Sequence, residues 1–428
     1  MKAKKSADWR RLDNAAKIFP CTSTKADTKV FRFSCELTEP VDQPTLQLAL
    51  ERALEVFPGY RCSLRRGMFW YYLEDSTEQP IVREEYRPPC SALYEKGSRG
   101  LLFEVTYFRR RINFEVYHAL TDGTGAVQFL RVLVYHYLTI RHADRFADAL
   151  PALDYDASPT EKMDDSFRKY YTRKRKQHEA SPKAYKLRGP SLPDHRIAVI
   201  EGVMPVKAVL QKAHEYGATM TVFCAALLMC SIEKEMAMRH KKRPVVLAVP
   251  VNLRSYFPSG SARNFFSVIQ ARYHFRKNSN RLEDVIASLH DTFESELTQE
   301  KMEGRLNQFV QYDFNPVARI APLVVKDFVM RIGYDLSASK ETAAISNVGK
   351  IDMPPELREY IRLFDVFVST SRLQVCMCSF GDQLTASFTA PFVSTDIQKN
   401  FFRFLTGMGI PVEITSNVPF GAGEGDRK

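Results

Sequence analysis

The segment NFEVYHALTDGTGAVQFLRVLVYHYL, residues 113–138, constrains the fold of this chain more than any other stretch. It begins as a strand-like apolar run, passes through a short polar turn and continues with helical periodicity. The apolar residues of its second half recur at spacings of three and four: Val127, Leu130, Val134 and Leu138. This spacing predicts a helix from about Thr124 to Ile140, directly after a strand and a turn.

The turn between the predicted strand and helix contains a histidine whose chemistry suits catalysis. His118, Asp122 and Gly123 follow the pattern H-x-x-x-D-G, and an imidazole with an unperturbed pKa of about 6.5 can act as a general base near neutral pH. Asp122 can orient the turn through an ion pair or cap the following helix, and Gly123 lets the backbone turn tightly. A histidine at a strand end can also be purely structural, so the motif by itself leaves both interpretations open.

Length and composition favour a globular chain of more than one unit. The 428 residues exceed one ordinary core, so two domains of about 200 residues each are expected. Hydrophobic residues make up 45% and charged residues 26%, which is typical of soluble proteins. No apolar run reaches the roughly 18 residues of a membrane span. The basic N-terminal residues are not followed by an apolar stretch. We therefore expect no secretory signal, no membrane span and a cytoplasmic location.

The charge balance and the cysteines narrow the possible partners. A formal net charge of +11 favours anionic partners such as nucleic acid, an anionic membrane surface or a phosphate-bearing small molecule. No nucleic-acid-binding motif is present, so nucleic acid is not expected. The eight cysteines follow no disulfide or zinc spacing. Cys376 and Cys378 are predicted to lie on one face of a strand as reduced core thiols, and no metal site is expected.

The remaining segments divide the chain into two predicted lobes. The first, residues 1–185, carries the H-x-x-x-D-G motif, a strand VFRFSCEL, an amphipathic helix that stops at Pro58-Gly59, a strand GMFWYYLE and a hairpin that turns near residues 109–111. Residues 154–195 are polar and rich in Pro, Lys and Arg, which indicates an inter-domain connection. The second lobe, residues 186–428, alternates strands and helices, with one long helical region at 281–311, a hairpin at Gly381-Asp382 and SNVGKI as a turn or short strand.

Four segments resemble the motifs of a known family in their order along the chain. They are FPGYRCSL, HALTDG, VPVNLRSYFP and AAISNVGKI. Together they resemble the chloramphenicol acetyltransferase-like superfamily, most closely the branch of alcohol O-acetyltransferases and condensation domains. The resemblance implies an α/β (α+β) fold of two lobes, each a mixed sheet with helices. The lobes would form a V around a central channel with His118 inside it.

The resemblance also implies a mechanism and roles for individual residues. His118 would deprotonate a hydroxyl or amine acceptor, which attacks an acyl thioester without an acyl-enzyme intermediate; this agrees with the lack of a G-x-S-x-G motif. Asp122 would pair with Arg254 of the VNLR segment and serve a structural role. Ser346 and Asn347 are the candidates for binding the oxyanion, although SNVGK can equally be an ordinary polar turn. Tyr117 stands where several branches have a first histidine.

The absence of an ATP-binding motif and the positive charge of the chain indicate which acyl donor it uses. No Gly-rich ATP-binding loop is present, so the acyl group should arrive activated, as acyl-CoA, with a small alcohol or amine as acceptor. Nine Lys and Arg lie between Arg168 and Arg188. They could bind the phosphates of coenzyme A or an acidic acyl-carrier protein, or they could simply form the solvated face of a linker. We expect a monomer without a permanently bound cofactor. The alternatives are a condensation-type enzyme that acts with a separate acyl-carrier protein, and a catalytically silent binding protein on the same fold.

Overall fold

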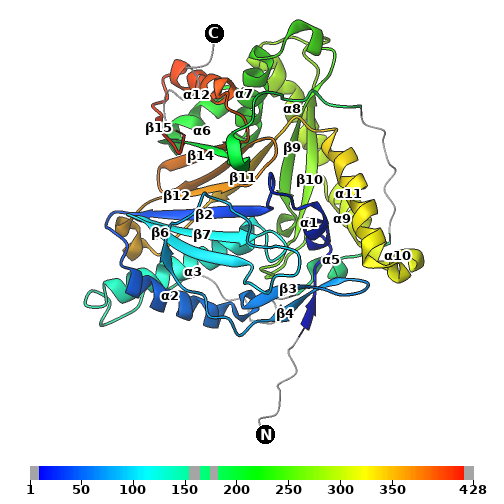
Figure 1. Ribbon diagram of the computed structural model, residues 1–428. Helices are drawn as coiled ribbons and strands as arrows, with labels where there is room; N and C mark the ends of the chain where they lie inside the picture. The colour runs from blue at the N-terminus through cyan, green and yellow to red at the C-terminus, as the bar shows by residue number, and fades with distance from the viewer. Residues whose placement is uncertain (1–8, 154–163, 174–181, 419–428) are drawn as a thin grey trace.

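A computed structural model describes residues 9–153, 164–173 and 182–418. In this part of the chain the strands form three sheets, of five, seven and three strands. The five-stranded sheet with its helices forms a first lobe, and the seven-stranded sheet with its helices forms a second lobe (Figure 1). The molecule therefore has the mixed α/β fold in two lobes that the sequence predicts.

The sheet of the first lobe has the strand order β12-β2-β7-β6-β5. Its strands are β2 (Val30–Leu37), β5 (Arg83–Glu84), β6 (Phe103–Phe108), β7 (Arg111–Tyr117) and β12 (Ile361–Val368). The predicted hairpin is confirmed, because β6 and β7 pair antiparallel on either side of Arg109, whose φ is +54°. Strand β12, which the sequence did not predict, pairs with β2 across more than 300 residues of chain. The C-terminal part of the chain therefore completes the first sheet.

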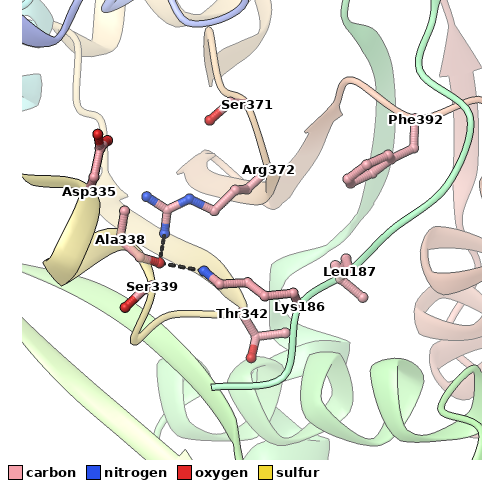
Figure 2. A pocket seen from close by; sticks show the side chains of 9 residues that line it. All are labelled: Lys186, Leu187, Asp335, Ala338, Ser339, Thr342, Ser371, Arg372 and Phe392. Carbon is pink, nitrogen blue, oxygen red and sulfur yellow. Dashed lines mark hydrogen bonds between the residues drawn. The ribbon is translucent and has the colours of Figure 1, made fainter. Parts of the chain in front are cut away.

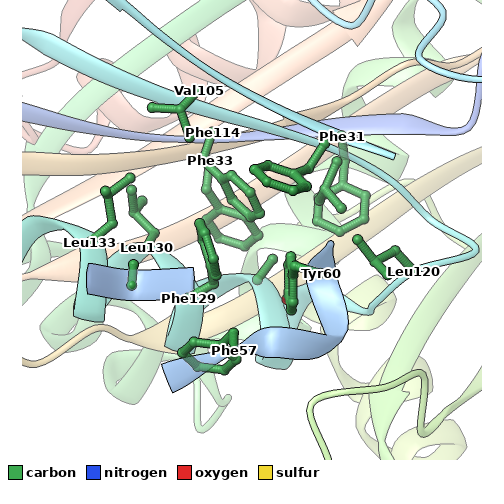
Figure 3. Close-up of a cluster of buried hydrophobic side chains, with 14 of the residues drawn as sticks. Phe31, Phe33, Phe57, Tyr60, Val105, Phe114, Leu120, Phe129, Leu130 and Leu133 are labelled. Atoms are coloured by element: carbon green, nitrogen blue, oxygen red, sulfur yellow. The ribbon is translucent and has the colours of Figure 1, made fainter. Parts of the chain in front are cut away.

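Two helices cover this sheet on one side, α2 (Gln43–Val56) and α3 (Gly123–Arg141). Asp42 caps α2 by accepting a hydrogen bond from the backbone N–H of Thr45, and α2 ends before Pro58 as predicted. Aromatic side chains fill the space between these helices and the sheet (Figure 3). Phe114 of β7 and Phe129 of α3 stack at 4.6 Å. Because the core reaches β2 and β7, it fixes the strand end that leads into the H-x-x-x-D-G turn.

The small sheet has the order β1-β4-β3, with β1 (Trp9–Arg11), β3 (Cys62–Arg66) and β4 (Tyr71–Asp75). The predicted strand GMFWYYLE is only partly correct, because residues 67–70 form the turn of the β3–β4 hairpin. The backbone N–H of Gly67 donates to the Trp70 carbonyl across this turn.

The sheet of the second lobe has the strand order β10-β9-β11-β13-β14-β8-β15. Its strands are β8 (Ala198–Pro205), β9 (Val245–Asn252), β10 (Phe266–Tyr273), β11 (Ala343–Lys350), β13 (Leu373–Phe380), β14 (Gln383–Ala390) and β15 (Glu413–Ser416). The hairpin at Gly381-Asp382 joins β13 and β14 as predicted. Of the two possibilities for SNVGKI, a turn or a short strand, the strand is correct: its first five residues belong to β11, an eight-residue strand parallel to β9 and β13, with an irregularity between Asn347 and Gly349.

The second lobe has its own helices, most of which share one hydrophobic core with its sheet. They are α6 (Val206–Glu215), α7 (Met220–Lys234), α8 (Leu282–Glu296), α9 (Gln299–Phe314), α10 (Pro316–Ile320), α11 (Leu323–Ala338) and α12 (Asp396–Gly407). The predicted long helix over 281–311 is divided, because the chain leaves α8 at Leu297 and Thr298 then caps α9. No single helix in the described ranges has the length and hydropathy of a membrane span. Only α6 and α7 taken together, at an angle of 81°, satisfy those criteria.

Part of the polar connection over 154–195 lies outside the described residues, including several of its Lys and Arg. Its described portion contains the short helix α5 (Ser166–Lys169) and then runs along the second lobe. The backbone N–H of Tyr185 donates to the Pro244 carbonyl, and Ser191 forms a bridge with Phe392. This portion is therefore held by backbone hydrogen bonds to the lobe that follows it.

Candidate active site

His118 follows the last residue of β7, and its backbone N–H donates to the carbonyl of Lys29 at 2.9 Å. Its imidazole is partly exposed and lies among aromatic rings. Phe19 stacks on it at 4.4 Å between ring centres, and Phe31 and Phe266 meet it at 4.9 and 5.5 Å. Burial among these groups lowers the pKa of His118 below its usual value of 6.5, so the neutral imidazole is favoured.

Asn264 fixes the orientation of the His118 ring, and nothing in the sequence pattern pointed to it. Its side-chain Oδ1 lies 3.0 Å from Nδ1 of His118. Its Nδ2 donates to the His118 carbonyl at 3.0 Å and to a carboxylate oxygen of Asp13 at 3.2 Å. Since both neighbours of Nδ2 are acceptors, the amide orientation follows, and Oδ1 accepts a hydrogen bond from Nδ1–H of His118. The other ring nitrogen, Nε2, then carries the free lone pair.

Asp13 is the third member of this chain of hydrogen bonds. It is fully buried and accepts from the backbone N–H of Ala16 at 2.7 Å, and Arg263 lies 3.6 Å away. Burial raises the pKa of Asp13 to about 6, while Arg263 opposes that rise. The carboxylate is therefore mostly ionised at neutral pH and holds Asn264 in the orientation that His118 requires.

Asp122 uses both carboxylate oxygens, so the ion pair and the helix cap coexist. Its Oδ1 accepts from the backbone N–H of Gly125 at 3.0 Å, which caps α3. Its Oδ2 accepts from Nη1 of Arg254 at 2.8 Å and from the backbone N–H of Phe265 at 2.8 Å. Both charged side chains are at least nine-tenths buried. Asp122 therefore joins the turn of the first lobe to residues 254–265 of the second.

Gly123 does not have the role that its place in the motif suggested. It is the first residue of α3, its φ is not positive, and a Cβ there would meet only Phe33 at 3.9 Å. Gly125 is the residue that must be small, because a Cβ would lie 2.1 Å from the Ala262 carbonyl oxygen and 2.2 Å from the Thr121 hydroxyl. That hydroxyl donates to the same carbonyl at 2.5 Å. The close approach of the two lobes, and not a tight turn, requires the glycine.

We expect Gly125→Ala to lower the free energy of unfolding by roughly 1–3 kcal/mol, the usual cost of forcing an extra group into a packed site. Gly123→Ala is the matched control, because the same methyl group has space there and alanine favours helix. Urea unfolding of both variants checks this. Equal stability of the two variants would mean that the lobes can separate locally without cost.

The side chains of Tyr117 and Asn347 have hydrogen-bond partners other than His118. Tyr117 is fully buried, stacks on Tyr94 and shares a hydrogen bond of 2.9 Å with Ser23. Nδ2 of Asn347 donates to the hydroxyl of Thr221 at 3.0 Å, and its Oδ1 accepts from the backbone N–H of Gly349. Within the described residues, no hydrogen bond connects Asn347 or Ser346 with His118.

A cavity of about 350 Å³ lies where the end of α11, the start of β13 and residues 186–187 meet (Figure 2). Its lining comprises Lys186, Leu187, Asp335, Ala338, Ser339, Thr342, Ser371, Arg372 and Phe392. Lys186 donates to the Ala338 carbonyl and, at 2.8 Å, to that of Glu341, while Arg372 pairs with the Glu341 carboxylate at 2.7 Å. Burial, with a smaller contribution from nearby Arg372, lowers the pKa of Lys186 to about 8. The cavity thus presents two neighbouring cations.

Comparisons with known proteins identify the fold. No family model matches the chain, and no curated protein matches it. Among solved structures, the first condensation domain of the calcium-dependent antibiotic synthetase matches with a TM-score of 0.62 and 14% identity, over 94% of this chain and 97% of that one. TRI101 of F. graminearum, in a complex with coenzyme A and T-2 mycotoxin, matches with a TM-score of 0.61 and 11% identity, over 92% and 96%.

TRI3 trichothecene 15-O-acetyltransferase from Fusarium sporotrichioides also matches, with a TM-score of 0.59 and 11% identity, over 93% of this chain and 94% of that one. Each of these matches spans both lobes. The chain therefore has the two-lobed fold found in these acetyltransferases and this condensation domain.

Proposed function

We propose that this protein is an acyltransferase that moves an acyl group from a thioester to a small hydroxyl or amine acceptor, with His118 as the general base. The observation that carries the proposal is the hydrogen-bonded chain from Asp13 through Asn264 to Nδ1 of His118. It leaves Nε2 of a partly exposed, neutral imidazole free to accept a proton. Similarity to proteins described as an acetyltransferase and a condensation domain supports the same chemistry.

In the proposed reaction, Nε2 of His118 takes the proton of the acceptor as the acceptor attacks the thioester carbonyl. The imidazolium that forms keeps its Nδ1–H on Asn264 Oδ1, and the negative charge of Asp13 lies behind that amide. The tetrahedral oxyanion then collapses, the carbon–sulfur bond breaks, and the leaving thiolate takes the proton back from Nε2. We retain Asn347 as the proposed oxyanion donor on the resemblance alone.

The cysteines support direct transfer instead of an acyl-enzyme. All eight are buried. Cys21 lies in α1 (Phe19–Thr22), the helix that supplies Phe19, and burial raises the pKa of its thiol to about 11. A thiol of that pKa carries little thiolate at neutral pH, and the thiolate is the nucleophilic form.

A screen of acyl-CoA thioesters against small alcohols, amines and thiols, read by mass spectrometry, tests the proposed function. We expect a product whose mass equals acceptor plus acyl group, together with free coenzyme A. Product formation with the wild-type chain and not with His118→Ala would support the proposal. A wild-type chain that binds these compounds without forming product would favour a silent binding protein.

Asn264→Leu should lower kcat by at least about tenfold, and by no more than the roughly 10⁴-fold seen when a catalytic histidine is held in the wrong tautomer. Asn264 Oδ1 accepts from Nδ1–H and so stabilises the imidazolium, which raises the pKa of His118 against the effect of burial. Its loss should therefore move the acidic limb of the kcat/KM profile to lower pH. If kcat falls while the acidic limb of the kcat/KM profile stays at the same pH, Asn264 has only a structural role.

The apparent KM for acyl-CoA should rise between low and moderate salt, while kcat changes less. Coenzyme A carries phosphates, and exposed ion pairs are screened over about 8–10 Å near physiological ionic strength. Lys186 and Arg372 of the cavity in Figure 2 are candidate partners for those phosphates. Steady-state kinetics at several salt concentrations checks this. Activity only with an acyl-carrier protein would favour the condensation-type alternative.

A further inference from the structure

Helix α11 turns an apolar face to solvent. Six of its residues have exposed fractions between 46% and 66%: Val324, Val325, Phe328, Val329, Ile332 and Leu336. At about 100° per residue these six positions fall within an arc of about 140°, so they form one apolar stripe, and the exposed carboxylate of Asp335 falls inside the same arc. In Figure 1, α9, α10 and α11 lie at the outer edge of the molecule, away from the first sheet. The stripe is therefore a feature of the molecular surface.

The opposite side of α11 is fixed to the protein by polar contacts. The hydroxyl of Tyr334 accepts from Nζ of Lys29 at 2.8 Å, and Asp327 accepts from the hydroxyl of Tyr71 at 2.8 Å. Nζ of Lys326 donates to the carbonyl of Phe69 at 2.9 Å. This arrangement is the reverse of an ordinary surface helix, which buries its apolar stripe. The contacts hold the helix with its apolar side outward.

The apolar surface continues beyond α11. The backbone N–H of Leu323 donates to the carbonyl of Met68 at 2.9 Å, which places the β3–β4 turn beside the start of the helix. Met68 is 75% exposed, Phe69 is 41% exposed, and Ile320 of α10 is 74% exposed. We call these three residues and the six of α11 the apolar ridge. Single exposed apolar residues are common, but a group of exposed apolar residues on neighbouring elements marks a site of interaction.

The charges around the apolar ridge favour an anionic partner. Arg319 and Arg331 are exposed beside it, whereas Asp327 is engaged by Tyr71 and Asp313 pairs with Lys17 and Arg168. Asp335, near the C-terminal end of α11, is an exposed carboxylate that falls between Val324 and Phe328 around the helix, so the two arginines outnumber it by one. The net charge of the whole chain is +11. An apolar stripe with flanking arginines on a helix that lies along the surface is the arrangement of an interfacial membrane helix.

We propose that the apolar ridge binds the surface of an anionic lipid bilayer, with α11 lying in the plane of the interface. The ridge adjoins the candidate active site, because α11 contacts α1 and Phe19 of α1 stacks on His118. Membrane binding would therefore bring the histidine close to the lipid phase. The proposal concerns binding and does not depend on the acyl-transfer reaction.

Co-sedimentation of the full chain with extruded vesicles tests the proposal. The wild-type chain should bind vesicles of phosphatidylcholine and phosphatidylserine more tightly than vesicles of phosphatidylcholine alone. Val324→Glu/Phe328→Glu should weaken that binding by at least about tenfold. Both side chains are 66% exposed, so the fold should tolerate the change. Arg319→Gln/Arg331→Gln should weaken binding to the anionic vesicles by roughly fivefold per arginine.

Leu150→Glu/Met238→Glu is the matched control, because it adds the same charge at exposed apolar residues elsewhere, 65% and 78% exposed. Its affinity for anionic vesicles should be within about twofold of the wild-type affinity, because salt screens the long-range repulsion between the added glutamates and the vesicle. Absence of wild-type binding at low salt, or equal weakening by both glutamate pairs, would overturn the proposal. So would light scattering that shows a wild-type dimer and a monomeric Val324→Glu/Phe328→Glu variant, because a second copy would then cover the ridge.

Discussion

His118→Ala is expected to reduce kcat by about 10²- to 10⁴-fold, the usual contribution of general-base assistance. The backbone hydrogen bond from residue 118 to Lys29 survives the substitution, and the imidazole is already partly exposed. The melting temperature should therefore change little. Turnover of an identified substrate pair, measured beside a thermal melt, separates loss of chemistry from loss of fold.

His142→Ala is the matched control for this experiment. Like His118, His142 stacks on an aromatic ring, here Tyr360 at 4.0 Å, and makes one side-chain hydrogen bond, to Glu39 at 2.9 Å. It lies at the other end of α3. Near-wild-type turnover in His118→Ala would show that another group accepts the proton, and a similar loss in both variants would point to a general effect on the fold.

Asp122→Ala should lower the free energy of unfolding by roughly 3–5 kcal/mol, because it leaves the buried guanidinium of Arg254 without its carboxylate. The same change removes the cap on Gly125, which alone is worth about 1 kcal/mol. Activity should fall as well, since Asp122 also binds the backbone N–H of Phe265, the residue after Asn264. Chemical denaturation measures the loss of stability.

The control for Asp122→Ala is Asp75→Ala. Asp75 pairs with Arg10 at 2.6 Å, but its side chain is 49% exposed, and exposed pairs contribute about 0–1 kcal/mol. Asp122→Asn keeps an oxygen for the cap while removing the charge, so it should fall between wild type and Asp122→Ala. A loss below 1 kcal/mol in Asp122→Ala would mean that water replaces the carboxylate beside Arg254.

Local sequence was sufficient for the elements whose signals are contained in a few neighbouring residues. The strand β2, the helix α2 with its stop at Pro58-Gly59, the hairpin at Gly381-Asp382 and the helix after H-x-x-x-D-G were all predicted, because periodicity and turn residues act over short distances. SNVGKI, which the sequence left open as a turn or a short strand, shows the limit of such signals. A polar segment rich in small residues can form a turn or a strand, and pairing with the distant strand β13 makes it a strand.

The sequence by itself predicted the residues of the motif and those strands and helices whose signals are local. Only the tertiary structure decided what surrounds them. Asn264 lies 146 residues from His118, and Asp13 lies 251 residues from Asn264. The pairing of β12 with β2 and the outward apolar face of α11 are equally non-local. A residue's own neighbours in the chain fix its backbone preference, whereas its hydrogen-bond partner and its exposure depend on which distant segment packs against it.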